Sequence, residues 1–309
     1  MTSRYGPLVL ICNTRSGRGT VAKALPTVRK ALEERDLQHE ILFTERSGHA
    51  IELAREAIGR GRRFLVAVGG DGTIHEVVNG MIENDKPANP DAVLGVVAAG
   101  TGSDFIKTFG LPAGPRAGVS HLEGDTAFQI DIGKVTYAAE RGEPATITRY
   151  FPNIAEVGFG AEAVATAARL PRWLGPMVYL VAFWLTMRKH KVARVKVDLV
   201  DRTYEGYMNN MVVANGQFFG GGMKIAPKAA PTDGLFDIQI EHARKREALA
   251  LIPKVFKGEH VPHPDIEEAK RVRVSIETDR PLRIEADGEV LGYTPAHFEL
   301  LKDLIALKV

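Results

Sequence analysis

The sequence predicts a chain of two domains: a three-layer α/β/α domain over residues 1–130 and an antiparallel β-sandwich domain over residues 131–294. In the first part, apolar runs without alternation are separated by helical segments, which indicates parallel strands buried on both faces. After about Gln129 the apolar runs alternate with polar residues and are punctuated by glycine, proline and aspartate, which is typical of antiparallel strands. A chain of 309 residues is long enough to bury a core in each domain.

The N-terminal elements follow one another in regular alternation. The expected strands are 8–12, 40–44, 63–68 and 92–100, and the expected helices are 26–35, 50–58 and the segment after Asp71. In that last segment, the apolar residues that recur on one helical face are Ile74, Val77, Val78, Met81 and Ile82. This order predicts an open parallel sheet.

The second part contains short strands and two helical inserts. The expected strands are 193–200, 207–215, 235–240, 271–277 and 281–286, and the expected helical inserts are about 161–191 and 245–257. The C-terminal segment 295–309 is a candidate to return to the first domain.

Composition limits the function classes. A net charge of +2 is too small to indicate a nucleic-acid partner, so none is expected. The single cysteine, Cys12, excludes an intramolecular disulfide framework and favours a cytoplasmic location. We expect no signal peptide before the first strand. The longest apolar stretch, 177–187, is much shorter than the ~20 residues that a membrane-spanning helix requires.

Four loops follow the expected parallel strands at their carboxyl ends, where such sheets bind ligands. They are "NTRSGRG" (13–19), Thr44 with Glu45, "GGDGT" (69–73) and "GTGSDF" (100–105). Together they offer glycine amides, hydroxyl groups, Arg15 and two carboxylates, Asp71 and Asp104. This combination favours a nucleotide polyphosphate with Mg²⁺. None of these loops is a Walker loop, because the sequence contains no G-x-x-x-x-G-K-[ST]. None is a dinucleotide fingerprint, because G-x-G-x-x-G is absent after the first strand.

Five motifs in order carry a family resemblance. They are "GGDGTIHEVVNG" (69–80), "GTGSDF" (100–105), "NIAEVGFGAEA" (153–163), "GGGMKIAPKAAPTDG" (220–234) and "ADGE" (286–289). The chain resembles the diacylglycerol kinase catalytic family, specifically its soluble bacterial lipid kinases, which are related to sphingosine and ceramide kinases. Ser103 departs from the pattern, since the family more often has asparagine there.

The resemblance implies an ATP-binding domain related to phosphofructokinases and NAD kinases, followed by a lipid-binding β domain. The residues that it places at the nucleotide are Asn13, Thr14, Arg15, Ser16, Gly17, Thr44, Gly69, Gly70, Asp71, Gly72, Thr73, Ile74, His75, Glu76 and Thr101. It also implies a structural Mg²⁺ held by the Asp233 carboxylate and the carbonyl oxygens of Ala230 and Leu235. By itself, "TDG" favours a simple turn.

The "ADGE" motif contains the candidate catalytic base. Asp-Gly between two strands indicates a hairpin, and on a regular strand Asp287 and Glu289 would point to the same side. A lipid hydroxyl needs a base to receive its proton during phosphoryl transfer. The family places its proton acceptor in this motif, and we assign it to Glu289, with Asp287 as partner or competing candidate. The remaining carboxylates, including Asp71 and Asp104, would form a water network with Mg²⁺.

The insert at 169–194 is the candidate membrane contact. An apolar stretch with Trp173, Tyr179 and Trp184 lies between basic flanks, which suits an anionic membrane interface. A buried helix that covers the β domain is an equally good interpretation. The expected partners are therefore a lipid substrate and, peripherally, an anionic membrane surface, and the sequence leaves a homodimer open.

The expected reaction is transfer of the ATP γ-phosphate to a lipid hydroxyl, with diacylglycerol as substrate and phosphatidic acid as product. The alternatives are a sphingoid-base or ceramide kinase, an NAD-kinase-like enzyme with a soluble substrate, and a lipid-binding protein without activity. The four carboxylates Asp71, Asp104, Asp287 and Glu289 favour an enzyme over the last of these.

Overall fold

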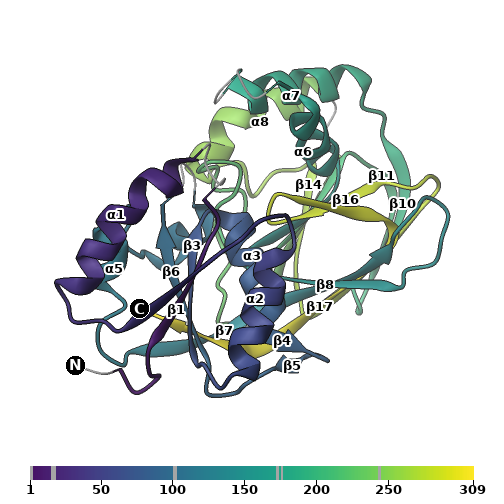
Figure 1. Ribbon diagram of the computed structural model, residues 1–309. Coiled ribbons are helices and arrows are strands. Elements are labelled where there is room, and N and C mark those ends of the chain that lie inside the picture. The colour runs from purple at the N-terminus through teal and green to yellow at the C-terminus, as the bar shows by residue number, and fades with distance from the viewer. Residues whose placement is uncertain (1–2, 15–18, 100–102, 172–173, 175–176, 243–244) are drawn as a thin grey trace. The chain divides into compact units, whose positions relative to one another are not determined.

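The computed structural model describes residues 3–14, 19–99, 103–171, 174, 177–242 and 245–309 (Figure 1). The chain divides into two compact units. The α/β unit consists of Met1–Ile132, Gly220–Gly222 and Leu301–Val309, and the β unit consists of Gly133–Phe219 and Met223–Leu300.

A parallel sheet forms the centre of the α/β unit. Its strands are β1 (Leu8–Cys12), β2 (His39–Phe43), β3 (Phe64–Gly69) and β6 (Val93–Ala98), in the order β6-β3-β1-β2. β1, β3 and β6 are buried along their whole length, as expected for strands covered on both faces. The predicted α/β/α class is confirmed.

Helices cover both faces of this sheet (Figure 1). On one face lie α1 (Thr20–Glu33) and α5 (Ala117–Ser120), which share a core with alternate residues of β1 and β3. α2 (His49–Gly59) and α3 (Asp71–Met81) pack together on the other face. The short α4 (Asp104–Phe109) follows β6. The expectation that the first helix starts at 26 is wrong, because Val21 extends the buried face upstream and α1 contains Pro26.

Within the α/β unit, the hairpin after α3 was not expected from the sequence. β4 (Ile82–Glu83) and β5 (Lys86–Pro87) pair directly after α3. Asn84 and Asp85 between them have φ angles of 51° and 61°, and these residue types tolerate the left-handed region that a tight hairpin requires.

The β unit is an antiparallel sandwich, as predicted. Its strands are β7 (Ala127–Ala138, from Gly133 onward), β8 (Ile147–Phe151), β9 (Ile154–Gly158), β10 (Ala193–Asp198), β11 (Thr203–Met208), β12 (Asn210–Ala214), β13 (Phe236–Glu241), β14 (Ile266–Arg271), β15 (Arg273–Thr278), β16 (Arg283–Ala286) and β17 (Glu289–Lys308, up to Leu300). One layer runs β14-β13-β12-β9-β16-β17, and β17 also pairs with β15 and β7 of the other. Their inner faces share one apolar core.

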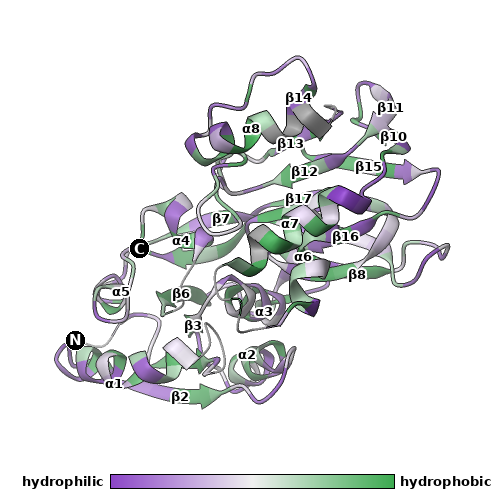
Figure 2. Ribbon diagram, turned by 90° about the horizontal axis from the view of Figure 1, so that it is seen from above, coloured by the Kyte–Doolittle hydropathy of each residue, from purple (hydrophilic) through white to green (hydrophobic). Residues whose placement is uncertain are grey.

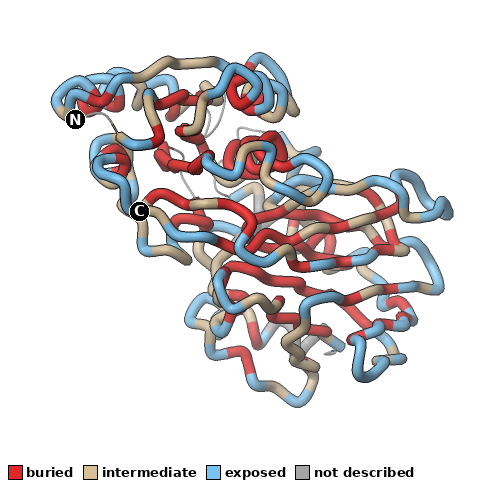
Figure 3. The backbone as a smooth tube through the Cα atoms, turned by 90° about the horizontal axis from the view of Figure 1, so that it is seen from below, coloured by how far each residue is buried: buried red, intermediate tan, exposed pale blue. Residues whose placement is uncertain are grey.

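Hydropathy and burial follow this layering. Figure 2 shows hydrophobic stretches along β12 and β17. Figure 3 shows buried backbone concentrated in strands and exposed backbone in the connecting turns.

Three helices complete the β unit: α6 (Phe159–Arg169), α7 (Met177–Lys189) and α8 (Lys245–Lys257). α6 packs on β9 and β16 and on α7, while Val255 of α8 packs on the apolar cluster that includes Ile154 and Val212. These helices therefore cover the outer face of the first layer. Among the described residues, no helix combines the length and apolarity needed to cross a bilayer.

The end of the chain belongs to the α/β unit from Leu301 onward. Within this unit, Ala306 and Leu307 pair in parallel with Val93 and Leu94 of β6. The returning segment is thus the last part of the long strand β17 and adds an edge to the parallel sheet.

Candidate active site

The loop between β3 and α3 is short, and it brings the end of the strand close to the first turn of the helix. A Cβ at Gly69 would lie 2.3 Å from Thr73 Oγ1, so a side chain there would collide with the first turn of α3. The amides of Thr73 and Ile74 both donate to the carbonyl of Gly70, at 3.0 and 3.2 Å. The helix therefore begins directly at the strand end, where its N-terminal dipole favours an anion.

Asp71 in this loop caps a second helix. Its Oδ2 accepts a hydrogen bond from the Asp104 amide at 3.1 Å, and its Oδ1 accepts one from the Phe105 amide at 3.0 Å. The carboxylate thus binds the first turn of α4 and joins the loops after β3 and β6. Both oxygens of the Asp71 carboxylate therefore accept hydrogen bonds from the protein itself.

Asp104 is 3 % exposed and also has protein partners. Its Oδ1 forms an ion pair with Lys107 Nζ at 2.7 Å, and its Oδ2 accepts a hydrogen bond from the Gly221 amide at 2.7 Å. Lys107 is a cation that sequence reasoning missed, although its position three residues after Asp104 places both on one face of α4. The hydrogen bond between Asp104 and Gly221 holds the Gly220–Gly222 segment against α4 within the α/β unit.

Three other predicted nucleotide residues, Asn13, Thr14 and Thr44, follow strand ends at the same edge of the sheet. The Asn13 amide donates to Val68 O and the Thr44 amide donates to Cys12 O, so Asn13 lies beside the end of β3 and Thr44 beside the end of β1. Thr14 directly follows Asn13 and is half-buried. Arg15, Ser16, Gly17 and Thr101 lie outside the described residues.

His75 and Glu76 have surroundings that the sequence did not indicate. His75 is 4 % exposed and belongs to the buried part of α3. Glu76 accepts hydrogen bonds from the amides of Gly48 at 2.8 Å and Ala50 at 3.0 Å. Its carboxylate therefore caps the start of α2 and links this helix to α3.

In the β unit, the "ADGE" segment forms the turn between β16 and β17. Asp287 and Gly288 have φ angles of 51° and 85°, and Ala286 pairs with Glu289 across the turn. Both central residues are left-handed, as in a two-residue hairpin. The hairpin that Asp-Gly indicates is present, and Asp287 lies in the turn itself, so the condition of a regular strand, under which Asp287 and Glu289 would share one side, is not met.

The two carboxylates of this hairpin have different surroundings. Asp287 Oδ1 accepts hydrogen bonds from the amides of Asn153 at 3.2 Å and Ile154 at 3.0 Å. The Asp287 amide donates to Ile154 O at 2.9 Å. Asp287 therefore anchors the hairpin to the start of β9, whereas Glu289 is exposed at the start of β17.

A group of buried acids under α6 was missed by sequence reasoning. Glu156 on β9 is 2 % exposed and Glu285 on β16 is 1 % exposed, and the two residues are direct cross-strand partners. Asn210 Nδ2 donates to Glu156 Oε1 at 2.8 Å. An acid inside each of the apolar runs "NIAEVGFG" and "PLRIEA" was the available signal.

Burial raises the pKa of these acids. The pKa of Glu156 rises to about 7, mainly through burial, and the hydrogen bond from Asn210 opposes the rise. Burial, followed by the charge of Glu156, raises the pKa of Glu285 well above its ordinary range. The pKa of Glu241 on β13 rises to about 7, for the same two reasons. Burial therefore favours the protonated form of these acids.

The predicted structural Mg²⁺ site contains an ion pair. Lys270 Nζ lies 3.0 Å from Asp233 Oδ2 and 3.0 Å from Asp237 Oδ2. Asp233 Oδ1 accepts a hydrogen bond from the Leu235 amide, and Ala230 O accepts two from the amides of Thr232 and Asp233. These residues fit Mg²⁺ only if Lys270 is displaced, because its ammonium group already contacts the carboxylates of both Asp233 and Asp237. The described residues contain no cluster of three or more His, Cys, Asp or Glu suited to a metal ion.

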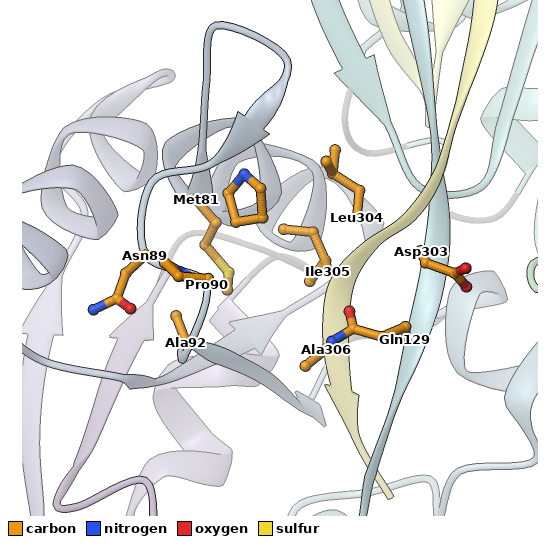
Figure 4. Close-up of a pocket in the computed structure, with 10 residues that line it drawn as sticks. Met81, Asn89, Pro90, Ala92, Gln129, Asp303, Leu304, Ile305 and Ala306 are labelled. Atoms are coloured by element: carbon orange, nitrogen blue, oxygen red, sulfur yellow. The ribbon is translucent and has the colours of Figure 1, made fainter.

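A cavity of about 160 Å³ lies in the α/β unit. Its lining includes Met81, Pro90, Ala92, Leu304 and Ile305, and Figure 4 shows these side chains around it. Ala92 precedes β6, so the cavity lies at the amino end of that strand, opposite to the edge that carries the predicted nucleotide loops. We assign it no role in phosphate binding.

The chain matches two family models in sequence. Residues 7–135 match the diacylglycerol kinase catalytic domain, and residues 153–309 match the YegS C-terminal NAD kinase beta sandwich-like domain.

Curated relatives and a solved structure match along nearly the whole chain. A diacylglycerol kinase of Staphylococcus haemolyticus is 30% identical over 297 residues, which cover 95% of this chain and 85% of that protein. One of Bacillus subtilis is 29% identical, over 94% of this chain and 91% of its own length. The crystal structure of a putative diacylglycerol kinase from Bacillus anthracis has a TM-score of 0.79 at 22% identity, covers 100% of this chain and 96% of its own, and supports the fold.

Proposed function

Because the chain belongs to the diacylglycerol kinase catalytic-domain family, we propose that it transfers the γ-phosphate of ATP to the hydroxyl group of diacylglycerol and forms phosphatidic acid. It is an ATP-dependent lipid kinase. The observation that carries the proposal is the match of both family models, together with the hairpin that presents Glu289.

The loops of the α/β unit bind the nucleotide. The N-terminus of α3 receives phosphate oxygens, and Gly69 leaves room for the Thr73 side chain in the first turn of this helix. Asp71 holds α4 in place next to this loop, and the Asp104 carboxylate pairs with Lys107 within α4. Mg²⁺ bound with ATP supplies neutralisation of the phosphate charge.

Glu289 accepts the proton of the lipid hydroxyl. In the transfer step, the hydroxyl oxygen forms a bond to the γ-phosphorus, the bond between that phosphorus and the bridging oxygen breaks, and ADP leaves with the bond electrons. The hydroxyl proton moves to the Glu289 carboxylate. Asp287 keeps the hairpin against β9 through the amides of Asn153 and Ile154.

Helix α7 contacts the membrane in this proposal, and the protein is cytoplasmic with peripheral membrane association. Ala182 and Thr186 form its buried face, while Met177, Trp184 and Leu185 are 53%, 53% and 43% exposed. The exposed basic residues at its end are Arg188, Lys189 and Lys191. An apolar face next to basic residues suits anionic head groups.

The experiment incubates the purified protein with ATP, Mg²⁺ and lipid in mixed micelles, and identifies phosphorylated products by mass spectrometry. Diacylglycerol, sphingosine, ceramide and NAD are compared. We expect phosphatidic acid as the main product, and a higher rate on another substrate would overturn the assignment. Glu289→Gln is expected to lower kcat by about 10²–10⁴-fold, the usual contribution of a general base, with little change in ATP affinity. If Asp287→Asn alone is inactive, Asp287 is the base.

A further inference from the structure

Glu285 and Glu156 form a buried acid pair directly beneath the catalytic hairpin. They are opposed in the antiparallel register of β16 and β9. Their neighbours in these strands, Ala286, Ala155 and Val157, belong to the sandwich core, so the two acids point to the opposite face. This face is the one covered by α6.

Glu285 holds the turn that carries the candidate base. Its Oε2 accepts a hydrogen bond from the Gly288 amide at 2.8 Å. Gly288 lies between Asp287 and Glu289, and Asp287 is bound to β9 from the other side. The turn is therefore attached at two residues, Asp287 and Gly288. Gly288, which is bonded to Glu285, is the one directly before Glu289 in the chain.

Ionisation of both buried carboxyl groups is unfavourable. Among the described residues, Glu156 Oε2 and Glu285 Oε1 are buried and make no hydrogen bond. Two ionised carboxylates opposed in this way would repel each other, whereas one protonated carboxyl can donate to the other. A Cβ at Gly160 would lie 2.2 Å from Glu156 Oε2, so α6 covers the pair closely.

Among the described residues, the charged groups that act on the pair do not supply a counter-charge. Glu241 on β13 adds a further acid, and the hairpin adds Asp287 and Glu289. On β16, Arg283 Nε is paired with Glu162 of α6 at 3.3 Å. A proton is thus the available means of satisfying both carboxyl groups.

We propose that Glu285 is a positioning residue for phosphoryl transfer: its carboxyl group, bonded to the Gly288 amide and sharing a proton with Glu156, fixes the hairpin that carries Glu289. This inference rests on the proposed role of Glu289 as proton acceptor. Glu285 itself does not touch the substrate. Its effect is on the orientation of Glu289, and misplacement of a catalytic group by about 1 Å can cost up to about 100-fold in rate.

The test compares Glu285→Leu with Glu285→Gln. Leucine removes the acceptor for the Gly288 amide, and we expect kcat to fall by about 10- to 100-fold while KM for ATP stays within about twofold. Glutamine offers an oxygen to Gly288 and an amide donor to Glu156, so it should restore most of kcat. Glu241→Leu is the matched control, because it removes an acid of the same face without contacting the hairpin, and it should keep wild-type kcat.

Hydrogen exchange provides a readout that does not depend on activity. The Gly288 amide should exchange faster in Glu285→Leu than in the wild type, and at the wild-type rate in Glu285→Gln. If the leucine variant does not fold, Glu285→Asp replaces it, since it retains polarity but is one methylene too short to reach the turn.

Three results would overturn the inference: wild-type kcat in the leucine or aspartate variant, equal loss in the glutamine variant, or unchanged Gly288 exchange. If the wild type phosphorylates no lipid, the proposed function fails, and the exchange data still decide whether Glu285 holds the turn.

Discussion

Replacement of Glu156 by glutamine should change how the stability of the β unit depends on pH. Burial raises the pKa of Glu156 from 4.5 to about 7 in the folded protein. Between these values the unfolded chain ionises while the folded chain keeps its proton. The free energy of unfolding therefore falls as pH rises from about 4.5, and it stops falling above the folded pKa of about 7.

The magnitude follows from the same shift. One pKa unit corresponds to about 1.4 kcal/mol, so full linkage for Glu156 is about 3 kcal/mol. Glutamine has no proton to lose, and it can still donate to Glu285. We expect the stability of Glu156→Gln relative to the wild type to increase by up to about 3 kcal/mol between pH 5 and pH 8.

The assay is urea denaturation followed by tryptophan fluorescence at several pH values. Both tryptophans, Trp173 and Trp184, belong to the β unit, so the signal reports on that unit alone. Glu143→Gln, at an exposed position, is the control and should follow the wild-type pH dependence. If the curves of Glu156→Gln and the wild type are parallel from pH 5 to pH 8, Glu156 does not retain a proton at neutral pH.

The remaining predictions concern single features of the two units. Gly160→Ala should lower the melting temperature, because its Cβ would lie 2.2 Å from Glu156 Oε2, and Glu156→Ala in the same chain should recover part of the loss. Asp71→Asn should abolish phosphoryl transfer; near-normal turnover at saturating Mg²⁺ would contradict its role. Changing the three basic residues after Trp184 (Arg188, Lys189 and Lys191) to glutamine should weaken binding to anionic vesicles by roughly 1 kcal/mol per residue, with a smaller effect on micellar substrate. Asp233→Ala should lower the melting temperature and activity together, and identical melting of the wild type with and without chelator would exclude a metal there.

The sequence by itself determined the class of each unit and the family. β1, β3 and β6 are uniformly apolar, so each could be identified as a strand from its own residues. The alternation of apolar and polar residues identified β10. The five motifs indicated the reaction because each is a short contiguous segment. Such information is local, and local preferences and turn chemistry are readable without knowledge of the partner segments.

The tertiary structure decided what each acid of those motifs binds. The sequence contains no indication that Asp71 caps α4 or that Glu76 caps α2. The turn at Asp287 could be predicted from Asp-Gly, but its attachment to Ile154 could not. Glu156 and Glu285 meet because β9 and β16 pair in one particular register. That register depends on packing across the whole sandwich, and a shift of β16 by one residue would turn Glu285 into the apolar core.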